Sequence, residues 1–410
     1  MVKKIVILGA GFGGLTAAKA LGKGIKKYDL QDDYEVILVD KNAYHTYTPT
    51  LYEVASLDKE TADYTKIKRI VTFPIEKLVK NLPIKFINDE VTELDVARRT
   101  GDIHLKNGYP IKYDYLILAL GSQTNFFGVP GAKEAAHEFK TFADAVKIRD
   151  AVLSEAPREN ICVIGGGSTG VELAGELKNW LGVKSNITII EAGPTVLSNF
   201  EPRVIEKISK RLLRLGIKVI VNSPVVSVDG KNKNLLLQDG DTVPYDVLIW
   251  TGGVEPSSVL RALPFRKTKE RTDVESGMVC IPESADLTVH GRIFGIGDIT
   301  CATNPKTGQI APQTAPAAIE QARVAAENVL RDIQTASHKK YVAKSYPYII
   351  PVGGKWAVAK IGPLIISGFL GWVLKGLVEL KYLASIMPLY KALIIWLRGL
   401  FIFIKNDRLG

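Results

Sequence analysis

The sequence predicts an α/β protein built from two nested Rossmann-type nucleotide-binding domains and a C-terminal helical module. Three observations predict this fold class. A buried strand followed by a glycine-rich turn and a helix occurs twice in the chain. In each copy, the next strand ends in a carboxylate. The last fifty residues, in contrast, are strongly apolar and carry single basic residues at intervals.

The composition is that of a globular protein with several domains. At about 150 residues per domain, 410 residues allow two or three domains, and 46% hydrophobic residues supply packed cores. The three cysteines form no CxxC pair, which favours a reducing compartment and argues against a disulfide framework or structural zinc. The net charge of +10 indicates an anionic partner: nucleic acid, a membrane surface or an acidic substrate. Met1 leads directly into a strand-like segment without the features of a signal peptide, so we expect a cytoplasmic protein.

The first nucleotide site is predicted near the N-terminus. Lys3 to Leu8 is an apolar, β-branched run typical of a buried parallel strand, and a helical stretch follows it. Between them, Gly9 permits a tight turn, Gly11 lets a pyrophosphate approach the backbone, and Gly14 lets helix and strand pack closely. Asp40 ends the next strand, 26 residues beyond Gly14, where its carboxylate can bind both hydroxyls of a ribose.

The same arrangement recurs in the middle of the chain. The apolar run 161–164 leads into a glycine-rich turn at 165–170 and a predicted helix. The strand 187–190 then ends in Glu191, 21 residues beyond that turn. The chain therefore has two predicted dinucleotide sites.

Later segments set the predicted domain boundaries. Both halves contain a similar late strand, at 113–121 and 245–253, so the repeat extends beyond the glycine turns. A strand at 292–298 and a helix at 314–332 return the chain to the first domain. We predict a discontinuous first domain at 1–145 and 275–330, a second domain at 146–274 and a C-terminal module at 331–410.

Two nested units with a Gly-Asp strand end resemble the two-dinucleotide-binding-domain flavoproteins over residues 1–330. The resemblance implies FAD in the first site, with Asp298 at its ribityl chain, and NAD(P)H in the second. No Arg or Lys immediately follows Glu191, which favours NADH over NADPH. The residues expected at FAD are Gly9, Gly11, Phe12, Gly13, Gly14, Asp40, Lys41, Val91, Ala119, Gly121, Asp298, Thr314 and Ala315. Those expected at NADH are Gly165, Gly167, Ser168, Gly170, Glu191 and Gly252.

Two segments point to a narrower family. Residues 42–55 (NAYHTYTPTLYEVA) are similar to the N-x-x-H-x-F-T-P-x-L-x-x-V-A segment of type II NADH:quinone oxidoreductases. Within this segment, His45 is expected to be a satisfied polar residue rather than a catalyst. Residues 170–177 resemble the family's G-V-E-L-A-G-E segment, which implies that Glu172 lies near the nicotinamide and the flavin as a catalytic residue.

A third segment matches the family less closely. Residues 311–321 resemble its P-x-T-A-Q-x-A-x-Q-Q pattern, which lines the quinone pocket and implies a catalytic role for Gln321. Pro316 and Glu320 replace glutamines of that pattern. Because proline offers no side-chain amide to a quinone carbonyl, the identity of the acceptor stays open.

Cysteine placement weighs against other members of the superfamily. Disulfide reductases and related peroxidases need a redox cysteine near the flavin, and the stretch 41–57 has none. Sulfide:quinone oxidoreductases, the nearest alternative, need a cysteine pair. Cys162 lies in a predicted buried strand and Cys280 in a strand-like run, so Cys301 is the one thiol expected near a flavin.

The C-terminal module is predicted to bind a membrane surface without crossing it. Its longest uncharged run, 361–374, has 14 residues, fewer than the roughly 20 that span a bilayer. Lys391, Arg398 and Lys405 recur every seven residues and fall on one stripe of a predicted amphipathic helix. Such a helix can lie in the interface with its basic stripe toward anionic headgroups. The alternative interpretation of these helices is a buried homodimer interface.

Taken with these segments, the resemblance implies an enzyme that passes a hydride from NADH to FAD and then electrons to a membrane quinone, without pumping protons. We expect it at the cytoplasmic face of the membrane, with no nucleic-acid partner, since no nucleic-acid motif is present. A basic residue of the tail, Lys381, is expected to assist at the quinone. The remaining alternative is a sensor that binds flavin and NADH without turnover.

Overall fold

The computed structural model describes residues 2–61, 63–96, 101–154, 159–260, 263–268, 271–275, 278–279, 292–304, 306–308 and 310–406. These residues form two compact units, each assembled from three segments of the chain. The first unit is Met1–His45, Phe73–Gln123 and Glu255–Tyr346, and the second is Thr46–Thr72, Thr124–Val254 and Pro347–Gly410. Cys280 lies outside the described residues.

A parallel sheet forms the centre of the first unit. Its parallel strands lie in the order β23 (Ile293–Gly295), β9 (Tyr115–Leu118), β1 (Lys3–Leu8), β2 (Tyr34–Asp40) and β5 (Ile84–Asn88). Ile7 of β1 pairs with Leu38 on one side and Ile117 on the other. From Ile5 to Leu8, β1 is wholly buried, because helices and loops cover both faces of the sheet, as a parallel sheet requires.

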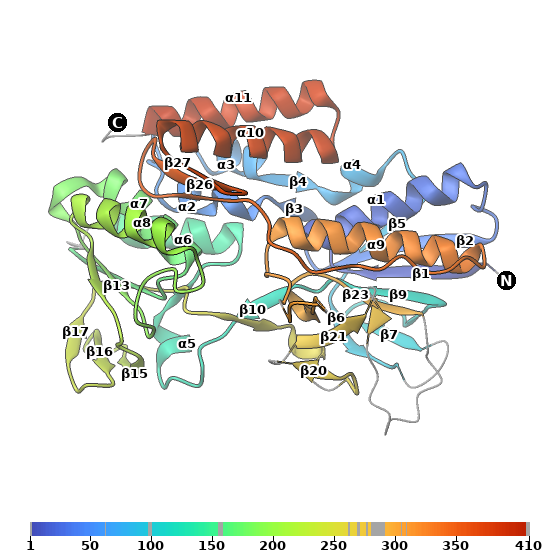
Figure 1. Cartoon of the computed structure of the whole chain (residues 1–410), viewed down its shortest axis with the longest axis horizontal. Helices are drawn as coiled ribbons and strands as arrows, with labels where there is room; N and C mark the ends of the chain where they lie inside the picture. Colours follow the sequence, from blue (N-terminus) through green and yellow to red (C-terminus); the bar gives the residue numbers. More distant parts are fainter. Residues whose placement is uncertain are drawn as a thin grey trace. The chain divides into compact units, whose positions relative to one another are not determined.

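Two long helices of the first unit lie side by side. They are α1 (Phe12–Lys27) and α9 (Ala315–Ile333), and Figure 1 shows them next to each other. Glycines of α1 allow the close approach: a Cβ at Gly24 would meet the side chain of Leu330 at 2.3 Å. The predicted helix at 314–332 and the return of the chain to the first nucleotide unit are therefore observed.

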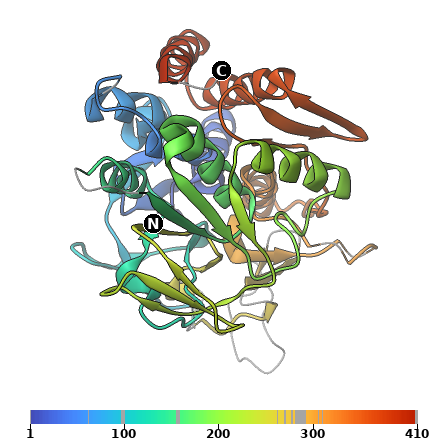
Figure 2. The ribbon, with the colours of Figure 1, turned by 90° about the vertical axis from the view of Figure 1, so that its left-hand side faces the viewer.

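The second unit repeats this plan. Its parallel sheet has the order β11 (His137–Glu138), β18 (Val247–Trp250), β12 (Asn160–Ile164), β13 (Asn186–Ile190) and β14 (Lys218–Ile220). The helices α7 (Ser168–Leu181) and α8 (Pro202–Arg214) lie beside these strands, drawn in green in Figure 2. Ile161, Val163 and Ile189 are buried in the core that the helices and strands share.

Smaller elements surround the two sheets. In the first unit they are α4 (Ile75–Val79), β6 (Val91–Leu94), β7 (Asp102–Leu105) and β8 (Ile111–Lys112). The first sheet itself continues beyond β23 through β22 (Met278–Val279), β21 (Arg271–Glu275) and β20 (Lys267–Thr268), and β24 (Thr300–Ala302) pairs with β21. In the second unit they are α2 (Leu51–Ala55), α3 (Tyr64–Val71), α5 (Ala132–Ala135), α6 (Phe142–Val152), β15 (Val225–Asp229), β16 (Asn234–Leu237) and β17 (Thr242–Pro244). Four short strands, β3 (Tyr44–Thr46), β4 (Thr72–Pro74), β10 (Ser122–Thr124) and β19 (Val254–Pro256), carry the chain from one unit to the other.

The C-terminal segment is a small antiparallel sheet followed by a helical hairpin. The sheet is formed by β25 (Tyr348–Pro351), β26 (Ala357–Ile361) and β27 (Leu364–Gly368). The helices α10 (Phe369–Ile386) and α11 (Leu389–Asn406) then lie side by side, in red in Figure 1. The uncharged run 361–374 therefore contains the last strand as well as the start of a helix. No described helix has the length and hydropathy to cross a bilayer.

The C-terminal segment packs against the second nucleotide-binding sheet's helices. A Cβ at Gly175 of α7 would lie 2.8 Å from the side chain of Val352, so the two backbones are in close contact. The Arg211 guanidinium donates to the carbonyl oxygens of Val352 (3.1 Å) and Gly353 (2.8 Å). The compact units consequently differ from the predicted domains: residues 46–72 and the tail from Pro347 belong to the second unit.

Candidate active site

The first glycine turn has a geometry that side chains do not permit. Gly9 has φ +98°, and a Cβ there would lie 2.3 Å from the carbonyl oxygen of Ala119, which follows β9. A Cβ at Gly14 would lie 1.7 Å from the carbonyl oxygen of Gly9. Around Gly11, in contrast, there is open space within 4 Å, at the N-terminus of α1. This combination of a tight turn, an open cradle and free helix N–H groups fits a dinucleotide pyrophosphate.

A carboxylate closes each glycine turn in the same way. Asp40 Oδ2 accepts a hydrogen bond from the N–H of Ala10 at 2.6 Å. At the second turn, Glu191 Oε2 accepts one from the N–H of Gly166 at 2.6 Å, and Oε1 accepts one from Gly193 at 2.7 Å. Because both carboxylates stand at the end of the second strand, they lie beside the turn, where a ribose of a bound dinucleotide is held.

The second turn repeats the steric features of the first. Gly165 has φ +100°, and a Cβ there would lie 2.6 Å from Cα of Gly252, which follows β18. A Cβ at Gly170 would lie 2.0 Å from the carbonyl oxygen of Gly165. Gly167 precedes α7 and has open space around it, and Ser168 is the first residue of that helix. The six residues predicted for NADH therefore lie together at the carboxyl edge of this sheet.

His45 supports the first glycine turn from within the protein. Its Nδ1 lies 2.9 Å from the carbonyl oxygen of Ala10, so Nδ1 carries the hydrogen. The Phe12 ring meets the imidazole edge to face, with the ring centroids 5.3 Å apart. Burial lowers the pKa of His45 to about 4, which keeps the imidazole neutral. This geometry agrees with the expectation of a satisfied polar residue.

Gln321 orients the turn that carries Asp298. The buried side-chain oxygen of Gln321 accepts a hydrogen bond from the N–H of Gly297 at 2.6 Å. Asp298 Oδ2 accepts a hydrogen bond from the Ser122 hydroxyl at 2.7 Å. In this structure, Gln321 thus shapes the Gly-Asp turn, and its own carbonyl group is engaged there.

The other residues predicted for FAD fall into two groups of the first unit. Lys41 and Val91 lie at one edge, because Lys41 forms an ion pair of 3.7 Å with Glu90. Thr314 and Ala315 start α9, close in sequence to Gln313, whose amide donates to the carbonyl oxygen of Asp298 at 3.0 Å. Gly13 of α1 faces Ile296 and Ala318, and Gly121 has φ +64° just after β9.

The second unit contains a buried group of charges that the sequence did not bring together. Lys375 Nζ of α10 forms an ion pair of 2.7 Å with Glu53 Oε1 of α2. Glu172 and Glu379 interact electrostatically with the same ammonium. We refer to Glu53, Glu172, Lys375 and Glu379 as the carboxylate cluster. Its one ammonium faces three carboxyl groups, which cannot all be ionised at low dielectric.

Two carboxyl groups of the carboxylate cluster have pKa values near neutral pH. Burial raises the pKa of Glu172 to about 8, with the Lys375 ammonium acting to lower it and Glu53 to raise it. Burial also raises the pKa of Glu379 to about 7. Burial lowers the pKa of Lys375, but Glu53 and Glu379 raise it above its ordinary value. We therefore assign the positive charge to Lys375 and the exchangeable protons of the cluster to Glu172 and Glu379.

An apolar pocket borders the carboxylate cluster. It has a volume of about 140 Å³ and lies in the helical hairpin. Its lining includes Glu53, Lys375, Glu379, Trp372, Trp396 and Phe403. Among the described residues, Glu53 Oε2 has no hydrogen-bond partner and is buried. A pocket lined by aromatic side chains, with charged groups on one side, suits a ligand that has an apolar ring with polar substituents.

Lys381, the tail lysine expected at the quinone, is exposed on α10, whereas Lys375 is one of the least exposed lysines, at 13%. Sequence analysis also missed Glu53 and Glu379 as members of the cluster. The sequence feature that could have indicated the cluster is Lys375 itself, which ends the longest uncharged run of the tail. Isolated charges next to apolar runs often face a partner in the interior.

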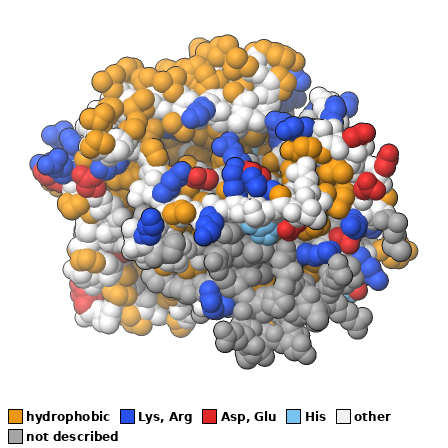
Figure 3. All heavy atoms as spheres, turned by 45° about the vertical axis from the view of Figure 1, so that its right-hand side comes forward, with side chains coloured by type: hydrophobic (Ala, Val, Ile, Leu, Met, Phe, Trp, Pro, Cys, Tyr) orange, Lys and Arg blue, Asp and Glu red, His pale blue; other side chains and the backbone are white. Residues whose placement is uncertain are grey.

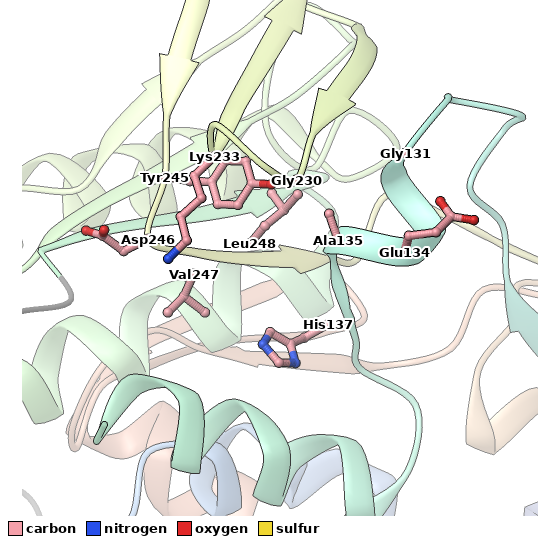
Figure 4. Close-up of a pocket in the computed structure, with 10 residues that line it drawn as sticks. All are labelled: Gly131, Glu134, Ala135, His137, Gly230, Lys233, Tyr245, Asp246, Val247 and Leu248. Atoms are coloured by element: carbon pink, nitrogen blue, oxygen red, sulfur yellow. The ribbon is translucent and has the colours of Figure 1, made fainter. Parts of the chain in front are cut away.

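A second pocket, of about 360 Å³, lies elsewhere in the second unit (Figure 4). His137, Lys233 and Asp246 contribute to its lining. Val247 and His137 are the first residues of their strands, so this pocket lies at the amino ends of the parallel sheet. Nucleotides bind at the opposite, carboxyl ends, where Gly165 and Gly252 are. The pocket is therefore separate from the second glycine turn.

Fold and site together define a flavin- and nicotinamide-binding class of oxidoreductase. Residues 3–322 match the sequence model of the pyridine nucleotide-disulphide oxidoreductase family, and the chain belongs to this family.

Curated relatives narrow the comparison. The type II NADH:quinone oxidoreductase Ndh of Mycobacterium tuberculosis is 26% identical, over 96% of this chain and 87% of that protein. The type II NADH:quinone oxidoreductase of Staphylococcus haemolyticus is 27% identical, over 83% and 85%. The demethylphylloquinone reductase NdbB of Synechocystis is 29% identical, over 80% and 78%. These relatives confirm the predicted resemblance.

Solved structures confirm the fold class. The structure of NDH2 from Plasmodium falciparum in complex with NADH has a TM-score of 0.81 at 19% identity and covers 100% of this chain and 99% of that chain. The sulfide:quinone oxidoreductase of Aquifex aeolicus has a TM-score of 0.74 at 21% identity and covers 94% and 91%. Both therefore share the fold, and the choice between the two activities depends on the site.

Proposed function

We propose that this chain is an NADH:quinone oxidoreductase that transfers a hydride from NADH to FAD and electrons from FAD to a membrane quinone, without pumping protons. The names of the curated relatives bear out NADH as the donor and quinone as the acceptor, and the family to which the chain belongs bears out the flavin cofactor. The observation that carries the proposal is the pair of glycine turns, each with its own carboxylate, in a chain that also has a buried proton-holding cluster.

FAD would be held by the first unit. The turn at Gly9, Gly11 and Gly14 would bind its pyrophosphate, Asp40 its adenosine ribose and Asp298 its ribityl chain. When bound, FAD supplies the two-electron acceptor that separates the oxidation of NADH from the reduction of the quinone. The protein contributes alignment, through the turn that Gln321 orients, and it excludes water.

NADH would be held by the second unit. The N–H groups at the start of α7 would bind the pyrophosphate, with Ser168 and Gly170 beside it. Glu191 would accept hydrogen bonds from the ribose hydroxyls, and its charge would repel the 2′-phosphate of NADPH. NADH is therefore the proposed donor.

The quinone would take its proton from the carboxylate cluster. The overall reaction converts NADH, one proton and a quinone to NAD⁺ and a quinol, so the protein must deliver one proton that the hydride does not supply. At neutral pH, Glu172, with a pKa of about 8, is mostly protonated and Glu379, with a pKa of about 7, is about half protonated, and Lys375 balances the charge when a proton leaves. In this proposal, Lys375 takes the role expected of Lys381.

The helical hairpin would bind the membrane surface, at its cytoplasmic face. Figure 3 shows hydrophobic side chains gathered along the upper edge of the view, over α10 and α11. The most exposed hydrophobic side chains there are Phe369, Leu370, Leu377, Val378, Leu389, Tyr390, Leu397 and Phe401. Lys391, Arg398 and Lys405 are also exposed, as an interfacial helix with a basic stripe requires. A homodimer formed through the same face is the alternative.

An anaerobic titration tests the proposed activity. FAD-loaded protein is mixed with NADH, NADPH or sulfide in separate cuvettes, and a soluble quinone is added after the flavin absorbance has settled. We expect rapid bleaching by NADH and recovery on addition of quinone. Bleaching by sulfide alone would instead favour a sulfide:quinone oxidoreductase. That outcome is disfavoured, because Cys162 and Cys301 are buried in different units. Bleaching without recovery would favour a sensor.

A further inference from the structure

We propose that Glu53 is a positioning residue for quinone reduction: by holding the Lys375 ammonium, it determines which carboxyl group of the carboxylate cluster carries the proton passed to the quinone. This inference rests on the proposed function. It concerns a residue at a position where the family segment that includes His45 specifies no residue type.

The contact between Glu53 and Lys375 is direct and shielded from water. Oε1 lies 2.7 Å from Nζ, and the two side chains are 10% and 13% exposed. Nζ also lies 5.3 Å from the centroid of the Tyr52 ring, which adds a cation–π contact on the same side. All five residues of α2 are buried, so Glu53 has no route by which to turn toward solvent.

The other carboxyl groups that face this pair come from two helices. Glu172 and Glu176 extend from α7 and Glu379 extends from α10, and all three act on the pair or its neighbours. Tyr47 and Tyr382 stack with ring centroids 5.2 Å apart, and burial raises the pKa of both phenols, so they stay neutral. Lys375 is the one ammonium among the groups named here, and four carboxyl groups compete for it.

In this structure, Lys375 pairs with Glu53 rather than with the other carboxyl groups. Because Lys375 donates to Glu53, its stabilising charge is closest to that carboxylate, and the other carboxyl groups keep their protons more readily. The charge on Glu53 also raises the pKa of both Glu172 and Glu379 directly. Both effects act in one direction and add to burial, which is the largest cause of the raised pKa of Glu172 and of Glu379.

The proton balance of the step follows. The quinone gains two electrons and two protons to become a quinol, and the hydride of NADH accounts for both electrons and one of the protons. The second leaves a cluster carboxyl group, which becomes a carboxylate beside Lys375 and is then reprotonated from solvent. Turnover should therefore fall as the pH rises through the pKa of the donor, about 8 for Glu172.

The test is the pH profile of Glu53→Gln in the FAD-loaded full chain with NADH and a soluble quinone. We expect the alkaline fall in kcat to move to lower pH by about one unit, a tenfold loss of proton affinity. Anaerobic reduction of the flavin by NADH, measured without quinone, should keep the wild-type rate. Glu206→Gln, which removes an exposed glutamate paired with Lys210, is the matched control and should leave the profile unchanged.

A second variant covers the case in which Glu53→Gln does not fold. Glu53→Asp keeps the charge but shortens the side chain, so it lengthens the contact with Lys375 and should move the profile in the same direction by a smaller step. A folded, active Glu53→Gln with the wild-type profile overturns the inference, as does an unchanged profile in Glu53→Asp when only that variant folds. A wild-type protein without NADH:quinone activity would instead overturn the proposed function.

Discussion

The carboxylate of Glu191 accepts a hydrogen bond from the N–H of Gly166 at 2.6 Å, as that of Asp40 does from Ala10 at the other turn. In each unit, a carboxylate at the end of the second strand thus holds the glycine turn that follows the first strand. The same carboxylate is left beside the proposed ribose site, so loop geometry and nucleotide choice depend on one residue in each unit.

Glu191→Gln should relax the choice of nucleotide. The amide keeps an acceptor for the Gly166 N–H but loses the charge that repels a 2′-phosphate. We expect the ratio of kcat/KM for NADPH to that for NADH to rise about tenfold, since a charged contact contributes ~1.5–3 kcal/mol and ~1.4 kcal/mol is a factor of ten. Asp40→Asn is the matched control, because it should lower FAD retention and leave this ratio unchanged.

Gly9→Ala and Gly11→Ala should both lower FAD binding, but for different reasons. A Cβ at Gly9 meets the backbone of Ala119, and φ is +98°, so the fold itself should lose stability. A Cβ at Gly11 meets nothing within 4 Å, so the protein should fold normally but bind FAD poorly. Thermal melting of the two apo proteins separates the cases, and equal melting temperatures would contradict this account.

Asn406→Ala should loosen the end of the helical hairpin. Asn406 Oδ1 accepts from the N–H of Asp58 at 3.0 Å, and Nδ2 donates to the carbonyl oxygen of Ser56 at 2.7 Å. Leaving these buried partners unsatisfied costs about 1–3 kcal/mol. Hydrogen exchange in α11 should become faster and the melting temperature should fall. Lys405→Ala, an exposed change one residue away, should alter neither.

Phe401→Glu should weaken binding to vesicles without affecting the chemistry. Phe401 is 71% exposed on α11, and a carboxylate there opposes both insertion into the acyl boundary and attraction to anionic lipids. Co-sedimentation with anionic vesicles should fall, while anaerobic flavin reduction by NADH stays normal. Leu236→Glu, at an exposed apolar position of β16, is the control. Equal loss in both variants would argue against a membrane-binding hairpin.

Acid should destabilise the protein partly through His45. Its folded pKa is about 4 against an ordinary 6.5, so the neutral form stabilises the fold fully above pH 6.5 and this contribution is lost as the pH falls toward 4. The full shift corresponds to about 3 kcal/mol. His45→Asn should make the free energy of unfolding less dependent on pH between 7 and 5, as measured by urea titration. A variant as acid-sensitive as the wild type would refute this role.

Local patterns predicted the nucleotide-binding parts well, because their signals are contiguous. The run of apolar residues before Gly9 and Gly165 and the carboxylates at Asp40 and Glu191 each lie within about 40 residues of their partners. Strand and turn chemistry therefore identified both turns and the helix after Thr314. Both glycine turns and the carboxylates Asp40 and Glu191 lie at the carboxyl ends of the parallel strands.

The carboxylate cluster was not predictable in this way. Glu53 and Lys375 are 322 residues apart in the chain, and they meet because α2 and α10 pack in one unit. The tail was predicted by its composition, which does not reveal that an apolar run contains both a strand and a helix. Its position against α7 depends on shape, above all on the missing side chain of Gly175.

The packing of Val352 and Gly353 against Gly175 and Arg211 has a practical consequence for preparing a detergent-free sample. Deleting everything after Tyr346 would expose the face of α7 at Gly175 and would leave the Arg211 guanidinium without the carbonyl oxygens of Val352 and Gly353 that now accept its hydrogen bonds. The C-terminal segment therefore cannot be deleted as a whole without loss of these contacts. For the proposed membrane-binding hairpin, a form that needs no detergent is better sought by replacing single outward-facing residues of α10 and α11 while the three-stranded sheet before them is left intact.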